Sequence, residues 1–408
     1  MSRKGTHRNP IDPQAHISLS DVQSCPGSPE PAEVLARSAS VTDAVRILTN
    51  SELSAGALQL DLFQVTRSPV VVAWGGGVDS TAMLIELVER GERIDIVLFA
   101  DTGGEDPRTY AFIKMFSSWL RAYGIVVVIV RYEPKDFKNW PPYRTLEENC
   151  LTNGTLPSKA FGFGSCSLKW KVAPQHSWLK GWSPAQAIWA AGGKVVKLIG
   201  YDCSTADNKR YAEALRYADP HYEYRYPLRE WGWDRADCIA RIARAGFPIP
   251  RKSACFFCPV TKPFELHEMS KVQLRRIVLL EARAKPRLRS VEGLWRTAVK
   301  GCRGAQPRPG SMTEYIRSVG LLPAEEIDAI STIAPVHLVR WQEHHRNETS
   351  GPDFREWVNL FDLWAERLHQ SGLPDIFPAI SKPVLALTFN QVSELDAANG
   401  ELTLSNAA

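Results

Sequence analysis

Three consecutive glycines, Gly75 to Gly77, separate an apolar β-branched run from the start of a helical pattern. The run at 70–74 has the pattern of a buried strand, and the residues from Val78 to Thr81 lead from the glycines into the helical pattern. Glycine lets backbone N–H groups approach an anion, and the positive end of the helix dipole points to the same place. The sequence therefore predicts a phosphate-binding loop, with an ordinary strand-to-helix turn as the alternative. It is neither a Walker loop nor a Gly-x-Gly-x-x-Gly loop, because the required lysine and glycine spacing are absent.

A second set of residues that could do chemistry is the Cys-x-x-Cys pair, Cys255 and Cys258. Two thiolates at this spacing can hold one metal ion from a tight turn, and two further ligands would complete a tetrahedral site. Two buried thiols packed beside aromatic side chains are the alternative. In a reducing compartment the eight cysteines favour thiols or metal ligands over disulfides.

The elements that must position these groups alternate between strand and helix. Strands are expected at 70–74, 94–100, 125–130 and 195–199, and helices lie between them, including 81–90 and 108–123. Continuous β-branched runs bounded by helices indicate a parallel sheet that is buried on both faces. We therefore expect a doubly wound, mostly parallel α/β sheet, whose ligands bind beyond the carboxyl ends of the strands.

The length of 408 residues suggests more than one unit. Residues 1–40 are rich in Pro, Ser and Gly, which predicts a disordered tail. We expect a nucleotide-binding domain over 41–262, with a helical lead-in at 41–62, and a helical C-terminal domain over 263–408. No signal peptide or membrane span is evident, so a cytoplasmic protein without a membrane partner is expected.

The net charge of +4 is small for this length and does not by itself indicate a nucleic-acid partner. Locally, the segment from Lys271 to Arg308 carries eleven Lys and Arg residues against Glu281 and Glu292. Such a segment could bind a phosphodiester backbone, and a solvated helix surface is the alternative.

The six residues from Gly75 to Ser80 resemble the Ser-Gly-Gly-x-Asp-Ser pyrophosphate loop of the ATP pyrophosphatases (PP-loop proteins), also called adenine nucleotide alpha hydrolases. Gly75 stands where that family usually has serine. The segment at 101–110 resembles the Asp-Thr-Gly…Pro-x-Thr-Tyr segment of the phosphoadenosine phosphosulfate (PAPS) reductase branch. The resemblance implies that ATP contacts the loop and the strand ends, namely Trp74, Gly75, Gly76, Gly77, Val78, Asp79, Ser80, Thr81, Asp101, Thr102, Gly103, Lys169 and Gly200.

Later segments follow the same branch. The segment at 164–174 is similar to its Cys-Cys-x-x-Arg-Lys-Val-x-Pro stretch, with Ser167 in place of the second cysteine. Branch members with an iron–sulfur cluster use that cysteine pair and a later Cys-x-x-Cys. Cys166, Cys255 and Cys258 match three of those four positions, which implies a bound iron–sulfur cluster or Zn²⁺. The fourth ligand is left open between Cys150, Cys203, Cys302 and a residue other than cysteine.

The matching segments occur in the family's order over about residues 65–265. The resemblance implies an enzyme that uses Mg²⁺ and cleaves ATP between the α and β phosphates to adenylate an acceptor. Sulfur transfer to a nucleic acid or a small molecule could follow. Asp79, Ser80, Lys171 and Arg210 are the implied catalytic residues, and Arg210 lies in a loop that resembles the family's Gly-x-Arg…Ser…Arg.

Three other functions stay open, and so does a homodimer. A sulfonucleotide reductase needs a nucleophilic cysteine near the C-terminus, and no cysteine follows Cys302. A flavin adenylyltransferase-like enzyme would not call for Cys255 and Cys258. A nucleotide-binding module without catalysis is the hypothesis from a different class, and Gly75 is its support.

Overall fold

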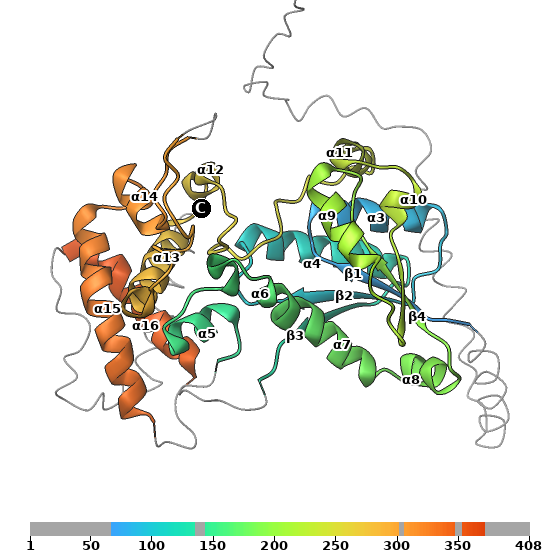
Figure 1. Ribbon diagram of the computed structural model, residues 1–408, viewed down its shortest axis with the longest axis horizontal. Coiled ribbons are helices and arrows are strands. Elements are labelled where there is room, and N and C mark those ends of the chain that lie inside the picture. The colour runs from blue at the N-terminus through green and yellow to red at the C-terminus, as the bar shows by residue number, and fades with distance from the viewer. Residues whose placement is uncertain (1–66, 135–142, 302–305, 347–352, 372–408) are drawn as a thin grey trace, which may run out of the picture. The chain divides into compact units, whose positions relative to one another are not determined.

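A five-stranded, all-parallel sheet in the order β3-β2-β1-β4-β5 organises the α/β part of the chain (Figure 1). The computed structural model describes residues 67–134, 143–301, 306–346 and 353–371. The expected tail, the helical lead-in at 41–62 and Cys302 lie outside the described residues. The strands are β1 (Val70–Trp74), β2 (Ile96–Asp101), β3 (Val127–Arg131), β4 (Val195–Ile199) and β5 (Tyr222–Arg225).

The α/β class and the parallel sheet are confirmed, and β1 and β4 begin and end at the predicted residues. Both are short β-branched runs that pair directly, with Val71 opposite Lys197 and Val72 opposite Leu198. The sequence analysis missed β5, because its residues Tyr-Glu-Tyr-Arg at the sheet edge lack an apolar run. Chain order reverses between β1 and β4, so the sheet has a switch point of the kind at which α/β proteins bind ligands.

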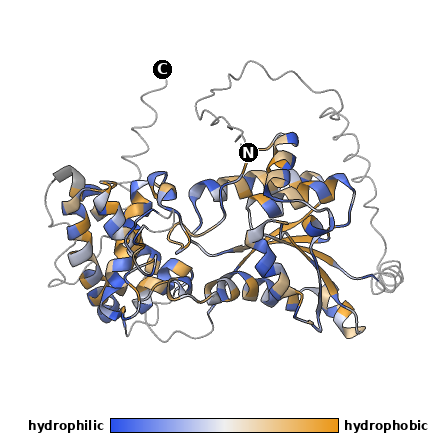
Figure 2. Cartoon of the chain, turned by 45° about the horizontal axis from the view of Figure 1, so that its top comes forward, coloured by the Kyte–Doolittle hydropathy of each residue, from blue (hydrophilic) through white to orange (hydrophobic). Residues whose placement is uncertain are grey.

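Helices cover both faces of the sheet (Figure 1). On one face, α3 (Val78–Glu89), α4 (Pro107–Ala122) and α11 (Arg235–Arg244) enclose a core that contains Val72, Phe99 and Leu198. On the other face, α7 (Ala173–Lys180) and α8 (Ser183–Ala190) pack against Val71 and Leu98. The central strands of the sheet are largely hydrophobic, and the helices carry polar residues among the apolar ones (Figure 2). This pattern fits burial of the sheet on both sides.

The C-terminal helices share one core with the segment around residue 150. This core joins side chains of three parts of the chain: α5 (Leu146–Asn153), the loop that carries Cys255 and Cys258, here called the cysteine loop, and the helices from α12 onward. The helices of this part are α12 (Pro263–His267), α13 (Lys271–Ala284), α14 (Met312–Ser318), α15 (Ala324–His344) and α16 (Phe354–Ser371). Short elements complete the described chain: η1 (Ser158–Phe161), α6 (Ser165–Ser167), the π-helix η2 (Leu168–Val172), α9 (Thr205–Ala214), α10 (Pro227–Glu230) and η3 (Lys285–Arg287). All the described residues belong to one compact unit.

Lys197 on β4 is a charged residue inside the second core, and only 3% of it is exposed. Burial lowers the pKa of Lys197 from 10.5 to about 8, and Asp219 opposes that shift. The unfolded chain therefore binds more protons than the folded chain between about pH 8 and 10.5, and stability rises with pH across that window. Below pH 8 the charged lysine costs on the order of 3 kcal/mol.

Replacing Lys197 with Met is expected to raise the free energy of unfolding at pH 7, because the desolvated charge is removed. The gain over the unchanged protein should shrink as the pH rises from 8 to 10.5. Urea denaturation at several pH values measures it, with the exposed Lys194→Met as the control. A stability difference that does not change with pH would show that Lys197 keeps its ordinary pKa.

Candidate active site

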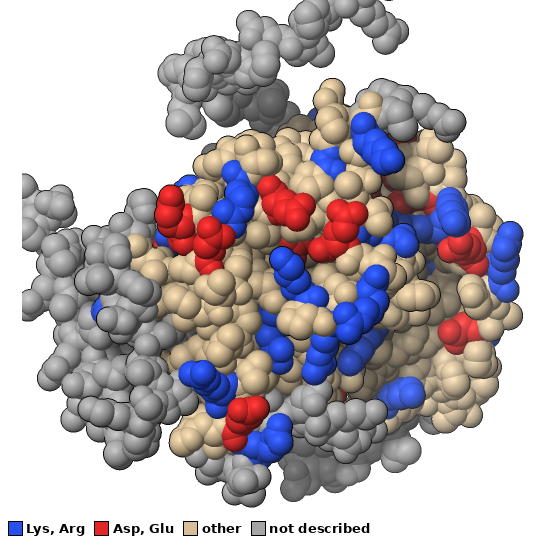
Figure 3. All heavy atoms as spheres, turned by 60° about the vertical axis from the view of Figure 1, so that its left-hand side comes forward, with Lys and Arg blue, Asp and Glu red and all other residues tan. Residues whose placement is uncertain are grey.

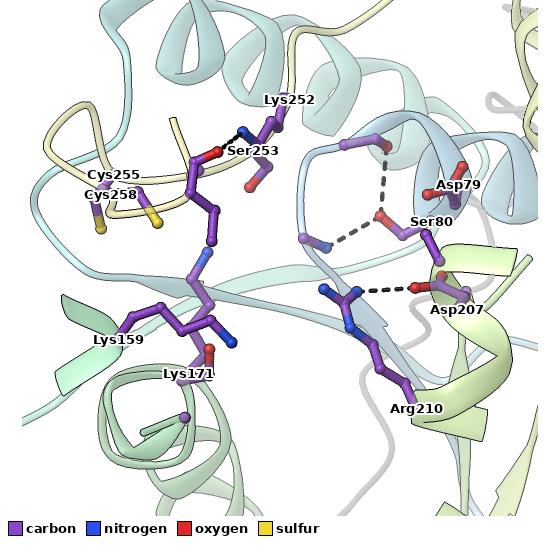
Figure 4. A pocket seen from close by; sticks show the side chains of 18 of the residues that line it. Asp79, Ser80, Lys159, Lys171, Asp207, Arg210, Lys252, Ser253, Cys255 and Cys258 are labelled. Carbon is purple, nitrogen blue, oxygen red and sulfur yellow. Dashed lines mark hydrogen bonds and ion pairs between the residues drawn. The ribbon is translucent and has the colours of Figure 1, made fainter. Parts of the chain in front are cut away.

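A cavity of about 830 Å³ lies at the carboxyl ends of β1, β2 and β4. Gly75 follows β1, Thr102 follows β2 and Gly200 follows β4, and all three line it. Figure 4 shows Asp79 and Ser80 on one side of the cavity and Cys255 and Cys258 on another. The position agrees with the general rule for ligand sites in parallel sheets.

The glycine loop presents backbone rather than side chain to the cavity. Gly76 has φ +72°, a left-handed conformation that favours glycine, and Gly77 is the N-terminal cap of α3. The Ser80 hydroxyl accepts a hydrogen bond of 3.2 Å from the Gly75 N–H, which ties the two ends of the loop together. Gly200 approaches the same loop closely, since a Cβ there would lie 2.9 Å from Ser80 Cα. The geometry provides the helix N-terminus and bare backbone that suit an anion.

Asp79 is held by an arginine that the sequence analysis did not single out. The Arg235 Nη1 atom donates to both Asp79 carboxylate oxygens, at 2.8 and 2.7 Å. Burial raises the pKa of Asp79, Arg235 opposes that shift, and the nearby Asp202 and Asp207 raise it further. Arg235 is the first residue of α11, directly after the Asp234 cap, so its approach to Asp79 depends on how α11 packs against α3.

Lys171 is held by a second residue that the sequence analysis missed. Its Nζ lies 2.9 Å from Glu105 Oε1, and the Glu105 side chain is fully buried. Burial lowers the pKa of Lys171, but the Glu105 carboxylate outweighs it, so the net pKa is raised and the lysine stays charged. The buried pair fixes the direction of the lysine at the cavity wall.

The remaining charged groups complete the set of charged side chains that line the cavity. Arg210 Nη1 donates to Asp207 Oδ1 at 2.9 Å, and Lys159 and Lys171 lie on the side of the cysteines (Figure 4). In total five cations and three carboxylates line the cavity: Lys159, Lys171, Arg210, Arg235, Lys252, Asp79, Asp202 and Asp207. Cations around a helix N-terminus suit a polyphosphate, and carboxylates beside them suit a hard divalent cation.

The structure brings most of the predicted nucleotide and catalytic residues together at the cavity. Those that line it are Gly75, Gly77, Val78, Asp79, Ser80, Thr102, Lys171, Gly200 and Arg210. Gly76 and Gly103 do not line it, although both take the positive φ that the loops require.

Four predicted nucleotide contacts instead have partners within the protein. Trp74 and Thr81 are buried and bonded to each other, with Nε1 donating to Oγ1 at 3.0 Å. The buried Asp101 accepts hydrogen bonds from Tyr110, Arg131 and the Gly103 N–H. Lys169 Nζ lies over three aromatic rings, the nearest being Tyr132 at 4.8 Å. None of these four residues lines the cavity.

The three predicted metal-binding cysteines, Cys166, Cys255 and Cys258, all line the cavity. The cysteine loop pairs with the loop after β2, where the Phe256 N–H donates to the Gly104 carbonyl at 2.8 Å. Cys255 Sγ lies 3.1 Å from Thr102 Oγ1. This pairing explains how the sheet brings the late cysteine pair to the nucleotide loop.

Of the two candidate fourth-ligand cysteines that the structure describes, Cys150 and Cys203, Cys150 lies nearer to these thiols. Burial raises the pKa of Cys150 well above its ordinary value, and Cys255 and Cys166 are close enough to raise it further. Cys203 lies elsewhere and donates to the Leu228 carbonyl. Within the described ranges, no three His, Cys, Asp or Glu side chains stand close enough together, as placed, to hold a metal ion.

The basic segment from Lys271 to Arg308 is largely engaged within the fold. Arg275 pairs with Glu326 and Glu366, and Arg276 pairs with Glu147 and Asp362. Arg283 and Arg287 donate to backbone carbonyls of α5. Arg303 lies outside the described residues. Basic and acidic side chains lie beside one another on the face shown in Figure 3. Several of the basic side chains of this segment are therefore held by partners within the fold, and binding of a nucleic acid by the segment stays a prediction.

When the chain was compared with protein-family models and with curated proteins, it matched none of either. Across the part of the chain that the structure describes, none of the helices combines the length and the apolar character needed to cross a membrane.

Proposed function

We propose that this protein is a cytoplasmic PP-loop ATP pyrophosphatase of the PAPS reductase-like type. It would cleave ATP between the α and β phosphates and adenylate an acceptor. The observation that carries the proposal is the cavity itself, in which the glycine loop and the N-terminus of α3 face five cations from separate segments. A doubly wound, adenine nucleotide alpha hydrolase-like fold is part of the same proposal, and the strand order supports it.

Backbone and side-chain groups of the cavity would have separate roles in this reaction. The loop N–H groups and Ser80 would hold the β and γ phosphates, which leave as pyrophosphate. Lys171 and Arg210 would stabilise the negative charge that develops on the bridging oxygen as its bond to the α phosphorus breaks. An acceptor oxygen would form the new bond to the α phosphorus from the opposite side. Arg235 would turn from Asp79 to the phosphates once ATP is bound.

Asp79, Asp202 and Asp207 are the residues that would hold Mg²⁺. All three line the cavity, and carboxylate oxygens are ligands that Mg²⁺ prefers. Burial, together with Asp202 and Asp207, raises the pKa of Asp79, and a cation would relieve the repulsion among the carboxylates. As placed, the three carboxylates are not close enough to share one ion, so binding would draw them together. When bound, Mg²⁺ would offset the charge of the departing pyrophosphate.

Two ATP analogues test the cleavage site. With β,γ-imido ATP we expect release of AMP or adenylated acceptor, because the α–β bridge is intact oxygen. With α,β-methylene ATP we expect binding without cleavage. The opposite pattern would place cleavage at the γ phosphate, and binding of ATP without any cleavage would favour the nucleotide-binding module.

We further propose that Cys150, Cys166, Cys255 and Cys258 hold an iron–sulfur cluster or Zn²⁺ beside the nucleotide. The thiols suit either group chemically, and burial raises the pKa of Cys255, so a nearby cation would be needed to keep it ionised. Such a group could bind sulfur or assist its transfer to the adenylated acceptor.

Replacing Cys258 or Cys150 with serine is expected to abolish the bound metal, because each removes one of four thiolates. Metal analysis and a visible spectrum after anaerobic purification measure the loss. Cys203→Ser is the matched control and should keep the metal. If Cys203→Ser loses the metal and Cys150→Ser keeps it, the assignment of the fourth ligand is wrong.

A further inference from the structure

Two exposed phenylalanines lie on segments that contribute residues to the cavity lining. Phe163 is 66% exposed and Phe264 is 64% exposed. Phe163 directly precedes Gly164, which lines the cavity, and Phe264 follows four residues after Val260, which lines another wall. Both rings are therefore open to solvent on segments that also line the cavity, where they are available to a ligand that extends out of it.

Residues Trp295 and Arg296 connect the two phenylalanine-bearing walls. Trp295 Nε1 donates to the Thr261 carbonyl at 2.8 Å, near Phe264. Arg296 Nη1 would lie 3.1 Å from a Cβ placed on Gly162, next to Phe163. Consecutive residues therefore contact both of the segments that carry the phenylalanines, which ties these two segments together.

Arg296 has an unusual backbone for its type. Its φ is +69°, and among the described residues it is the only one other than glycine with a positive φ. A side chain in this region is uncommon and often marks a functional position. The Arg296 guanidinium lies beside Gly162, two residues before Gly164, which lines the cavity.

Exposed cations accompany the rings. Lys159, Lys262 and Arg296 are exposed, and none of the three has an ion pair with another described residue. The nearby acid Glu265 is already paired with Lys252 at 3.1 Å. We call Lys159, Phe163, Lys262, Phe264 and Arg296 the cavity mouth.

We propose that the cavity mouth binds a single-stranded nucleic acid. Exposed aromatic rings stack on unpaired bases, and unpaired cations beside them neutralise the phosphodiester backbone. A duplex keeps its bases stacked inside and leaves no base free for the two rings. Binding of the strand does not depend on the proposed ATP cleavage, but its role as the acceptor rests on that proposed function.

The test is fluorescence anisotropy with labelled single-stranded DNA and RNA of about a dozen nucleotides. We expect single strands to bind the full chain more tightly than the matching duplex. Phe163→Ala and Phe264→Ala should each weaken binding between about fivefold and a hundredfold, the range for one stacked base. Arg296→Gly removes the cation and suits the positive φ, so it should reduce the salt dependence by a slope of about 0.7.

Tyr123→Ala is the matched control. Tyr123 is 59% exposed at the end of α4, just before β3 begins and so away from the carboxyl ends of the strands. Absence of single-strand binding at low salt, preference for duplex, or an equal loss in Tyr123→Ala would each overturn the inference.

ATP binding by the same variants separates this inference from the proposed function. If ATP is not cleaved but the phenylalanine variants still lose the strand, only the proposed cleavage fails. If ATP is cleaved and the variants bind the strand normally, only the cavity-mouth inference fails.

Discussion

Replacing Asp79 with Asn is expected to reduce pyrophosphate release about 10²- to 10³-fold, the usual effect of removing one preorganised electrostatic contact from an active site. Asp79 lies on the first turn of α3, where its carboxylate faces the cavity and orients Arg235. Asn keeps the shape but loses the negative charge that would hold Mg²⁺ and Arg235. Ser80→Ala should lower turnover less, because it removes one hydroxyl and the 3.2 Å contact to the Gly75 N–H.

Glu89→Gln is the matched control for Asp79→Asn. It also removes a carboxylate from α3, its side chain is 63% exposed, and it is remote from the cavity lining. Turnover should stay near that of the unchanged protein. If Asp79→Asn and Glu89→Gln have equal turnover, the glycine loop is not the site of ATP cleavage.

Replacing Lys171 with Met is expected to lower both stability and turnover. Loss of the lysine leaves the fully buried Glu105 carboxylate without its partner, which should cost about 3–5 kcal/mol of unfolding free energy. Adding Glu105→Gln removes the uncompensated charge. The double variant should therefore recover most of the stability while its turnover stays low, because the cation at the bridging oxygen is still missing.

Urea denaturation and pyrophosphate release measure the two effects separately on the same samples. Lys180→Met, an exposed position on α7, is the control and should change neither. If the double variant regains normal turnover, then Lys171 serves only to neutralise Glu105 and does not contact ATP.

The sheet could be predicted from the sequence where burial alone sets the pattern. β1 and β4 are β-branched on both faces because both faces pack against helices, so their bounds follow from composition. The glycine loop could be predicted as well. Gly76 has a positive φ that would strain another residue, and a side chain on Gly200, which follows β4, would clash with the loop. β5 was missed because an edge strand need not be apolar.

The partners of the site residues could not be predicted, because they depend on tertiary contacts between distant segments. Arg235 and Asp79 are separated by 156 positions in the sequence, and Lys171 and Glu105 by 66, yet each pair is in contact in the fold. Asp and Lys are residue types that often contact a ligand. In the fold, however, Asp101 accepts a hydrogen bond from Arg131, and Lys169 lies over aromatic rings. Likewise, the buried ion pairs of Arg275 and Arg276 are indistinguishable in the sequence from a solvated basic face.

The most direct test of the central claim is the identity of the phosphate products when the protein turns over ATP with Mg²⁺. Phosphorus-31 NMR of the reaction mixture distinguishes pyrophosphate from orthophosphate without a coupled enzyme. We expect pyrophosphate together with AMP or an AMP-linked acceptor, and we expect Asp79→Asn to abolish both signals in parallel. Accumulation of ADP and orthophosphate, in a reaction that Asp79→Asn likewise abolishes, would contradict cleavage between the α and β phosphates.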